Sequence, residues 1–270
     1  MLNLLSMTPQ ADWSFWQWVT FFVVDKHSEF IRGAGFTLLI AISGTVIGSV
    51  IGLFIGVIRT IPERLNTPKI RIFLLRFVKG VLRLYIEIFR GTPMIVQAMV
   101  IYYGMAQVFG IRLPNITAGI IIVSINTGAY MAEIVRGGIE SIDKGQFEAA
   151  HTIGMNHKQT MLHIILPQAI RNILPVTGNE FIINIKDTSV LSVISVTELF
   201  FVSRSIAGTY MNYFAAMTVT CAIYLVLTVT TTLILRYVEQ RIDGPSSYTI
   251  YGSSTVPGAA IKVKGGAADA

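Results

Sequence analysis

Four stretches of this chain lack Asp, Glu, Lys and Arg over a length sufficient to cross a lipid bilayer. They are Gly33–Ile58, Gly91–Ile111, Leu113–Ala132 and Ser205–Leu235, with 26, 21, 20 and 31 residues. A helix needs about 20 apolar residues to cross a hydrocarbon core of about 30 Å. Charged residues make up 13% of the chain, about half the share in a soluble domain. The sequence therefore predicts an all-α membrane protein and excludes a disordered chain or a disulfide scaffold.

Basic residues alternate between sparse and dense segments along the chain. Lys and Arg number 2 before Gly33, 8 in Arg59–Arg90, 1 at Arg112, 5 in Glu133–Asp187, 1 at Arg204 and 4 from Arg236 onward. Because basic loops remain on the cytoplasmic side, this alternation predicts the N-terminus outside and the C-terminus inside. That orientation needs an odd number of crossings, so we add a fifth span, Val176–Leu199, although Glu180, Lys186 and Asp187 interrupt it. The same rule accounts for the net charge of +6 without a nucleic-acid partner.

The ends of the chain differ in composition from the apolar middle. Residues 1–30 contain the aromatic run Trp13–Val24, which is too short to span and predicts an extracytoplasmic interfacial segment. Residues 31–242 form the expected transmembrane domain. Residues 243–270 are rich in Gly, Ser, Pro and Ala, which predicts a flexible cytoplasmic tail.

Two patterns predict how the first spans pack. Gly44, Gly48, Gly52 and Gly56 recur every four residues, so they share one helical face and favour close approach of a partner helix. The alternative is chance, because membrane helices are rich in glycine. In Lys69–Arg90 a second helical face carries charged residues, which are Arg76, Lys79, Arg83, Glu87 and Arg90. That stretch either lies against anionic headgroups or continues into the second span and faces a subunit boundary.

A short segment between the third and fifth candidate spans predicts a helical hairpin. Gln146–Ile153 favours a helix, and Gly154 can end it in the left-handed conformation. Asn156 can then cap a second helix, His157–Ile165, which we expect to end before Pro167. From physics alone, an ordinary surface loop is an equal alternative.

This hairpin resembles the EAA loop of the permeases of ABC importers. Glu148-Ala149-Ala150, Gly154 four residues later, and Ile164-x-Leu166-Pro167 match that motif at every position. Further stretches resemble the polar amino acid branch of the family, which includes histidine, glutamine, glutamate and arginine permeases. They are Phe89–Pro93, Ala129–Ile139 and Ile185–Leu191. The likeness runs from about Ile31 to Arg241.

The resemblance implies a bacterial, multi-pass cell-membrane permease with a five-helix core of the type I ABC importer kind. Its EAA loop, about residues 137–167, would dock on separate ABC ATPase subunits through Glu148, Ala149, Ala150 and Gly154. ATP and Mg would bind to those ATPases, and we expect no cofactor, catalytic residue or metal site in this chain. The further partners implied are a second, identical or homologous permease, an extracytoplasmic solute-binding protein, membrane lipids and a polar amino acid.

Polar residues recur along the fifth candidate span with helical spacing. They are Thr177, Glu180, Asn184, Thr188, Ser192, Ser195 and Glu198. Ionisable groups at membrane depth face a bundle interior or a water-filled cavity. We therefore predict a substrate pathway lined by Glu180, Asn184 and Thr188, with Asn126 and Thr127 from the third span. The alternative is that Glu180, Lys186 and Asp187 pair with neighbours at the inner interface.

Two rival classes of function remain open on the sequence. An ion-driven secondary amino acid transporter often carries two repeated halves, and no repeat is evident here. A membrane scaffold without transport activity would leave the polar stripe unexplained. Uptake that persists without ATP would favour the secondary transporter.

Overall fold

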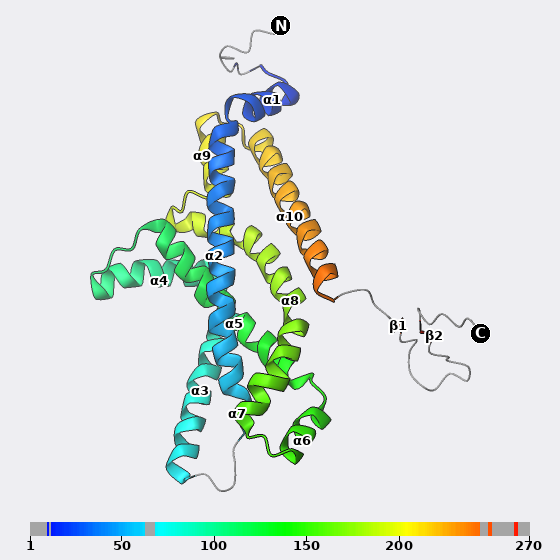
Figure 1. The fold of residues 1–270 in the computed structure, drawn as a ribbon. Coiled ribbons are helices and arrows are strands. Elements are labelled where there is room, and N and C mark those ends of the chain that lie inside the picture. The colour runs from blue at the N-terminus through cyan, green and yellow to red at the C-terminus, as the bar shows by residue number, and fades with distance from the viewer. Residues whose placement is uncertain (1–9, 11, 63–67, 244–247, 250–261, 264–270) are drawn as a thin grey trace, which may run out of the picture. The chain divides into compact units, whose positions relative to one another are not determined.

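The computed structural model describes residues 10, 12–62, 68–243, 248–249 and 262–263, and nearly all of them are helical (Figure 1). The α-helices are α1 (Phe15–Asp25), α2 (His27–Thr60), α3 (Lys69–Gly91), α4 (Met94–Phe109), α5 (Asn115–Glu140), α6 (Lys144–Thr152), α7 (His157–Thr160), α8 (Leu166–Asp187), α9 (Leu199–Thr209) and α10 (Tyr213–Asp243). A π-helical turn, η1 (Met161–Ile165), precedes α8, and a 3₁₀ helix, η2 (Thr188–Ile194), follows it. The all-α prediction is confirmed for the described residues, apart from one pair of two-residue strands.

The chain divides into two units, Met1–Val229 and Thr230–Ala270. In the second unit, strand β1 (Tyr248–Thr249) pairs antiparallel with β2 (Lys262–Val263). Apart from Asp243 and these two strands, the predicted tail, residues 243–270, lies outside the described residues. The packing below belongs to the first unit.

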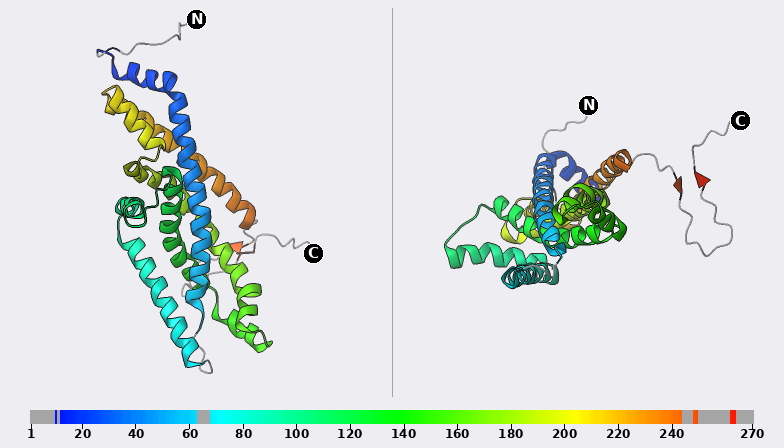
Figure 2. Two further views of the ribbon diagram at one scale, coloured as in Figure 1. Left: turned by 90° about the vertical axis from the view of Figure 1, so that its left-hand side faces the viewer. Right: turned by 60° about the horizontal axis from the view of Figure 1, so that its bottom comes forward.

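The four glycines of α2 form a ladder that packs directly on α5, and the ribbons of these two helices lie side by side (Figure 2). A Cβ atom built at Gly44, Gly48, Gly52 or Gly56 would overlap, in that order, Val123, Thr127, Met131 or Val135. The partner positions rise by four in the same direction, so the two helices run parallel. Because lipid gives helices no hydrophobic reason to associate, the contact depends on dispersion between closely approaching backbones. The predicted tight packing is confirmed, and its partner is α5.

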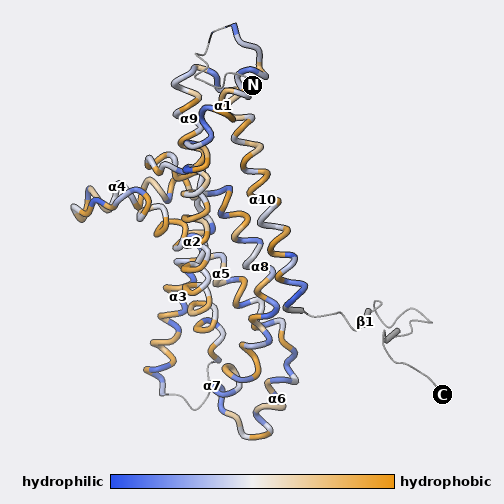
Figure 3. The backbone as a smooth tube through the Cα atoms, turned by 45° about the horizontal axis from the view of Figure 1, so that its top comes forward, coloured by the Kyte–Doolittle hydropathy of each residue, from blue (hydrophilic) through white to orange (hydrophobic). Residues whose placement is uncertain are grey.

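The predicted spans agree with the structure only in part. Among the described residues, α2, α5 and α10 are each long and apolar enough to cross a membrane, and Figure 3 shows hydrophobic residues along most of α2 and α10. In place of the span Gly91–Ile111, α4 has 16 residues, fewer than a perpendicular crossing requires. The span Ser205–Leu235 is also divided, because α9 ends at Thr209 and α10 begins at Tyr213.

The fifth candidate span, Val176–Leu199, is broken rather than continuous. The α-helical part ends at Asp187, η2 follows, and Ser195 adopts a left-handed conformation with φ of 60°. The segment His157–Ile194 and α9 meet at 54°. Asn115 Nδ2 donates to the Ser195 carbonyl at 2.9 Å, and Asn115 Oδ1 accepts from the Tyr102 hydroxyl at 2.9 Å. The prediction that one helical face carries the whole polar stripe is therefore wrong.

The aromatic run near the N-terminus folds as the helix α1, and its interfacial location stays a prediction. Trp18, Phe21 and Phe22 are buried against the turn between α9 and α10. The Lys26 ammonium pairs with Glu29 at 2.9 Å and lies 5.6 Å from the ring centroid of Tyr210. The hydrogen bond to Glu29 raises the pKa of Lys26 above its usual value. These contacts fix α1 to the start of α2 and the end of α9.

The glycine ladder predicts that one added methyl group lowers the free energy of unfolding at a ladder position but not at a glycine outside the ladder. We expect Gly52→Ala to lower the free energy of unfolding by about 1–3 kcal/mol, because its Cβ would overlap the backbone of α5. Gly80→Ala in α3 is the control, since nothing lies within 4 Å of its Cβ. It should be neutral or stabilise by about 0.5–1 kcal/mol. Thermal unfolding of the purified chain in detergent compares them, and equal melting temperatures would contradict this packing.

Candidate functional site

The predicted hairpin is present and is closed by a Schellman motif. Helix α6 begins after Asp143, whose Oδ1 accepts from the Gly145 amide at 2.6 Å. At its other end the Met155 amide donates to the Ala150 carbonyl and the Gly154 amide donates to the His151 carbonyl, both at 3.0 Å. Gly154 has φ of 82°, a conformation that glycine adopts without a steric penalty. The predicted glycine turn is therefore confirmed.

The second arm of the hairpin begins as expected but does not end before Pro167. Asn156 and Gln159 form a capping box, in which each side-chain oxygen accepts a hydrogen bond from the backbone N–H of the other residue. After α7 the helix widens into η1, where the Leu166 amide donates to the Met161 carbonyl five residues earlier. Pro167 then lies in the first turn of α8, where its missing N–H costs little. The hairpin therefore continues directly into α8.

An apolar cluster anchors the hairpin to α5. Ile139 and Ile142, at and just beyond the end of α5, pack with Met161 and Ile165 of η1, and Phe147 of α6 packs against this cluster. The cluster also contains Met131 and Val135, which face the glycine ladder of α2. The hairpin is thus attached to the same helix that α2 holds.

The four predicted ATPase-coupling residues divide between the surface and the interior. Glu148, Ala149 and Gly154 are exposed, whereas the Ala150 side chain is only 1% exposed. Ala150 therefore belongs to the interior of the hairpin and not to its outer surface. Sequence reasoning missed Ile153, which is 75% exposed beside the glycine turn. An apolar residue next to a predicted turn was the signal that could have identified it.

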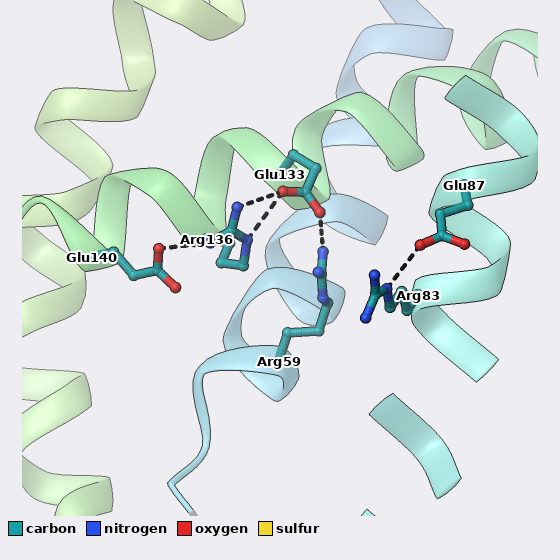
Figure 4. Close-up of polar contacts among 6 residues, drawn as sticks. All are labelled: Arg59, Arg83, Glu87, Glu133, Arg136 and Glu140. Carbon is teal, nitrogen blue, oxygen red and sulfur yellow. Dashed lines mark hydrogen bonds and ion pairs between the residues drawn. The ribbon is translucent and has the colours of Figure 1, made fainter. Parts of the chain in front are cut away.

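A chain of ion pairs links the end of α2 to the end of α5 (Figure 4). Glu133 accepts from Arg59 through one carboxylate oxygen and from Arg136 through the other, at 2.8 and 3.0 Å for Arg136. Arg136 also donates to Glu140 at 2.6 Å. Glu133 and Arg136 lie within the stretch Ala129–Ile139, to which the sequence assigned no individual roles.

A charged groove of about 640 Å³ lies between α3 and α5 next to this chain. Its polar lining consists of Arg59, Arg83, Glu87, Arg90, Tyr130 and Glu133. Arg83 pairs with Glu87 at 2.8 Å, and the Arg90 guanidinium lies 5.4 Å from the ring centroid of Tyr130. Glu180, which is partly exposed, lies on α8, and α8 packs on α5. Charged groups of both signs therefore line the groove between α3 and α5.

The predicted pathway residues Thr127 and Asn184 are hydrogen-bonded to each other in the interior of the protein. Asn184, which is 4% exposed, donates through Nδ2 to Thr45 Oγ1 at 2.8 Å and to Thr127 Oγ1 at 3.0 Å. These bonds join α2, α5 and α8. In this conformation Thr127 and Asn184 therefore bind helices together, and their contact with substrate stays a prediction.

The other predicted pathway residues, and Glu198 of the polar stripe, have different surroundings. Thr188 is buried and donates to the Ile185 carbonyl, whereas Asn126 donates to Gln97 Oε1 at 2.9 Å. Glu198 is fully buried and caps α9 by accepting from two backbone amides, and it also accepts from the Tyr224 hydroxyl. Glu180 is the predicted pathway acid that remains partly exposed.

Comparison with known proteins places this chain among transport proteins. Residues 72–244 match the family model described as binding-protein-dependent transport system inner membrane component. The chain is 37% identical over 213 residues to the glutamine transport system permease protein GlnP of Escherichia coli (strain K12), covering 78% of this chain and 92% of GlnP. It is 32% identical over 205 residues to the arginine transport system permease protein ArtQ of Bacillus subtilis (strain 168), covering 76% and 90%.

Solved structures share the fold. A chain of an amino acid ABC transporter solved with histidines superposes with a TM-score of 0.73 at 37% identity, covering 87% of this chain and all of that one. An inward-facing MetNI methionine ABC transporter matches with a TM-score of 0.66 at 19% identity, covering 81% and 98%, which supports the fold alone. The fold is that of the type I ABC importer permeases. These permeases are multi-pass inner-membrane components of transporters, and they act in transport rather than as catalysts. The chain belongs to the family of binding-protein-dependent transport system inner membrane components.

Proposed function

We propose that this permease subunit imports a polar amino acid and is coupled to separate ABC ATPase subunits by the α6–α7 hairpin. The observation that carries the coupling role is the surface of the hairpin, where Glu148, Ala149 and Ile153 are exposed around Gly154. A small, partly apolar tip with one carboxylate can enter a groove on a partner protein. The ATPases would bind ATP and Mg, and their closure would move the hairpin.

Contacts run without interruption from the hairpin to the helices, which coupling requires. The hairpin packs on the end of α5, α5 packs along α2, and the Arg59–Glu133–Arg136 chain joins their ends. Movement of the hairpin would therefore shift α5 together with α2. ATP binding would favour one state of the permease because the ATPases contact the hairpin differently in the two states.

The charged residues between α3, α5 and α8 support a polar amino acid as the substrate. A zwitterion needs a positive partner for its carboxylate and a negative partner for its ammonium. Arg90 lines the charged groove and Glu180 of α8 is partly exposed, so the two residues supply charges of both signs. The relatives named for glutamine and arginine transport agree with this substrate class. We propose that Glu180 lines the pathway, with Asn126, Thr127, Asn184 and Thr188 positioning the helices around it.

The remaining partners and the orientation belong to the same proposal. A second permease, identical or homologous, would complete the pathway, and an extracytoplasmic solute-binding protein would deliver the substrate. The N-terminus lies outside and the hairpin faces the cytoplasm. The parallel direction of α2 and α5 fits their places as the first and third of five crossings, and the proposed orientation rests on the distribution of basic residues.

Substitution of Gly154 by valine tests the coupling role. Valine is strained at a φ of 82°, so Gly154→Val should distort the turn and lower ATP-driven uptake into proteoliposomes by roughly 5–150-fold. Gly137→Val is the matched control, because Gly137 lies in α5 with nothing within 4 Å of its Cβ. Both variants should remain folded, although strain at position 154 should lower the free energy of unfolding of Gly154→Val by about 1–2 kcal/mol. Equal uptake by the two variants would contradict the coupling role.

Substitution of Glu180 by glutamine tests the pathway. Glu180→Gln keeps the size of the side chain but removes its charge, so we expect the KM for uptake of an amino acid to rise about tenfold. Glu140→Gln, at the exposed end of α5, removes the same charge and should change KM little. Unchanged KM in Glu180→Gln would remove Glu180 from the pathway, and ATPase binding should be normal in both variants.

A further inference from the structure

A crevice of about 590 Å³ lies between the first half of α3 and the beginning of α7. Its walls are mostly aliphatic, with Ile61 after α2 and Ile72, Leu75 and Val78 of α3. Arg71 of α3 and Lys158 of α7 line it with their basic side chains. The crevice therefore combines an apolar interior with cations from two separate elements.

Among the described residues, the charged side chains that line the crevice are all basic. No acidic residue is among the described residues that line it. Arg71 and Lys158 are exposed, and within the described part of the chain neither pairs with a carboxylate. Lys79 is engaged nearby, since its Nζ donates to the Ile61 carbonyl at 2.6 Å and holds the end of α2 against α3. The crevice is therefore complementary to an anion.

The outer surface of α3 next to the crevice is strongly apolar. Ile70, Phe73 and Phe77 are 75%, 68% and 62% exposed and recur with helical spacing. Such a stripe suits contact with acyl chains rather than water. The uncharged part of α2 ends at Ile58, only three residues before Ile61. The crevice therefore lies at the boundary between the apolar layer and the basic loops.

We propose that this crevice binds an anionic phospholipid of the cytoplasmic leaflet. Its phosphate would contact Arg71 and Lys158, and one acyl chain would lie along Ile72, Leu75 and Val78. Basic pockets at the cytoplasmic side of membrane helices bind such headgroups, whereas a soluble anion would gain nothing from the aliphatic walls. This inference rests on the proposed orientation, with the hairpin facing the cytoplasm.

A lipid in this crevice would act on the coupling hairpin. Lys158 lies in the first turn of α7, two residues after the N-cap Asn156, so a headgroup that bridges Arg71 and Lys158 joins α3 to the second arm of the hairpin. Lipid composition would therefore influence how the hairpin moves relative to α3.

Native mass spectrometry of the purified full-length chain in detergent tests the site. Wild-type protein should retain phosphatidylglycerol about tenfold more than phosphatidylcholine, and Arg71→Gln/Lys158→Gln should lose this preference. Lys144→Gln/Arg171→Gln removes the same charge from exposed positions outside the crevice and should keep it. Melting temperatures confirm that all three proteins are folded.

Several results would overturn the proposal. These are no lipid preference in wild-type protein, retention of the preference by the crevice variant, or equal loss in the control variant. Competition by soluble glycerol phosphate at concentrations similar to the lipid would also overturn it, since the site would then bind free anions. ATP-driven uptake by the reconstituted transporter is measured separately. Normal uptake without lipid preference would overturn this inference alone, whereas lipid preference without ATP-driven uptake would overturn the proposed function alone.

Discussion

The close contact between α2 and α5 is the constraint on which the rest of this permease depends. Inside a bilayer, helices gain little by hiding apolar surface from one another, because lipid is equally apolar. The glycines of α2 remove the side chains that would separate the two backbones, and residues of α5 occupy that space. The contact fixes α5, and α5 in turn carries the hairpin at one end and one wall of the charged groove. The proposed coupling hairpin and the proposed pathway therefore share this helix.

Polar groups add specificity to this apolar framework. Asn184 joins three helices through two threonines, and Glu198 caps α9 while binding Tyr224 of α10. A buried polar group left unpaired costs more than a paired one contributes, so such groups fix one arrangement of the helices. Glu180 differs because it lacks a hydrogen-bond partner among the described contacts and is partly exposed. Glu180 is therefore free to contact a substrate, whereas Asn184 and Glu198 are used in contacts between helices.

Local patterns could be predicted from the sequence, whereas tertiary choices could not. The glycine ladder and the Gly154 turn follow from spacing and backbone preference, and both are present. The break after Asp187 could not be predicted, because Ser195 is held in its left-handed conformation by Asn115, 80 residues away. The burial of Asn184 has the same origin, since helical periodicity reveals a polar face but not whether protein or water covers it. Lipid-facing and partner-facing apolar surfaces are equally indistinguishable by composition.

The proposed coupling requires that an ABC ATPase subunit binds the tip of the hairpin at the cytoplasmic face of the membrane. The most direct test places a single cysteine at the exposed position 153 (Ile153→Cys) in a Cys221→Ser background and adds a short bifunctional cross-linker to the assembled transporter. We expect a cross-link to the ATPase subunit whose yield changes when ATP is bound. Absence of that cross-link, together with labelling of the cysteine in intact cells by a membrane-impermeant reagent, would contradict it.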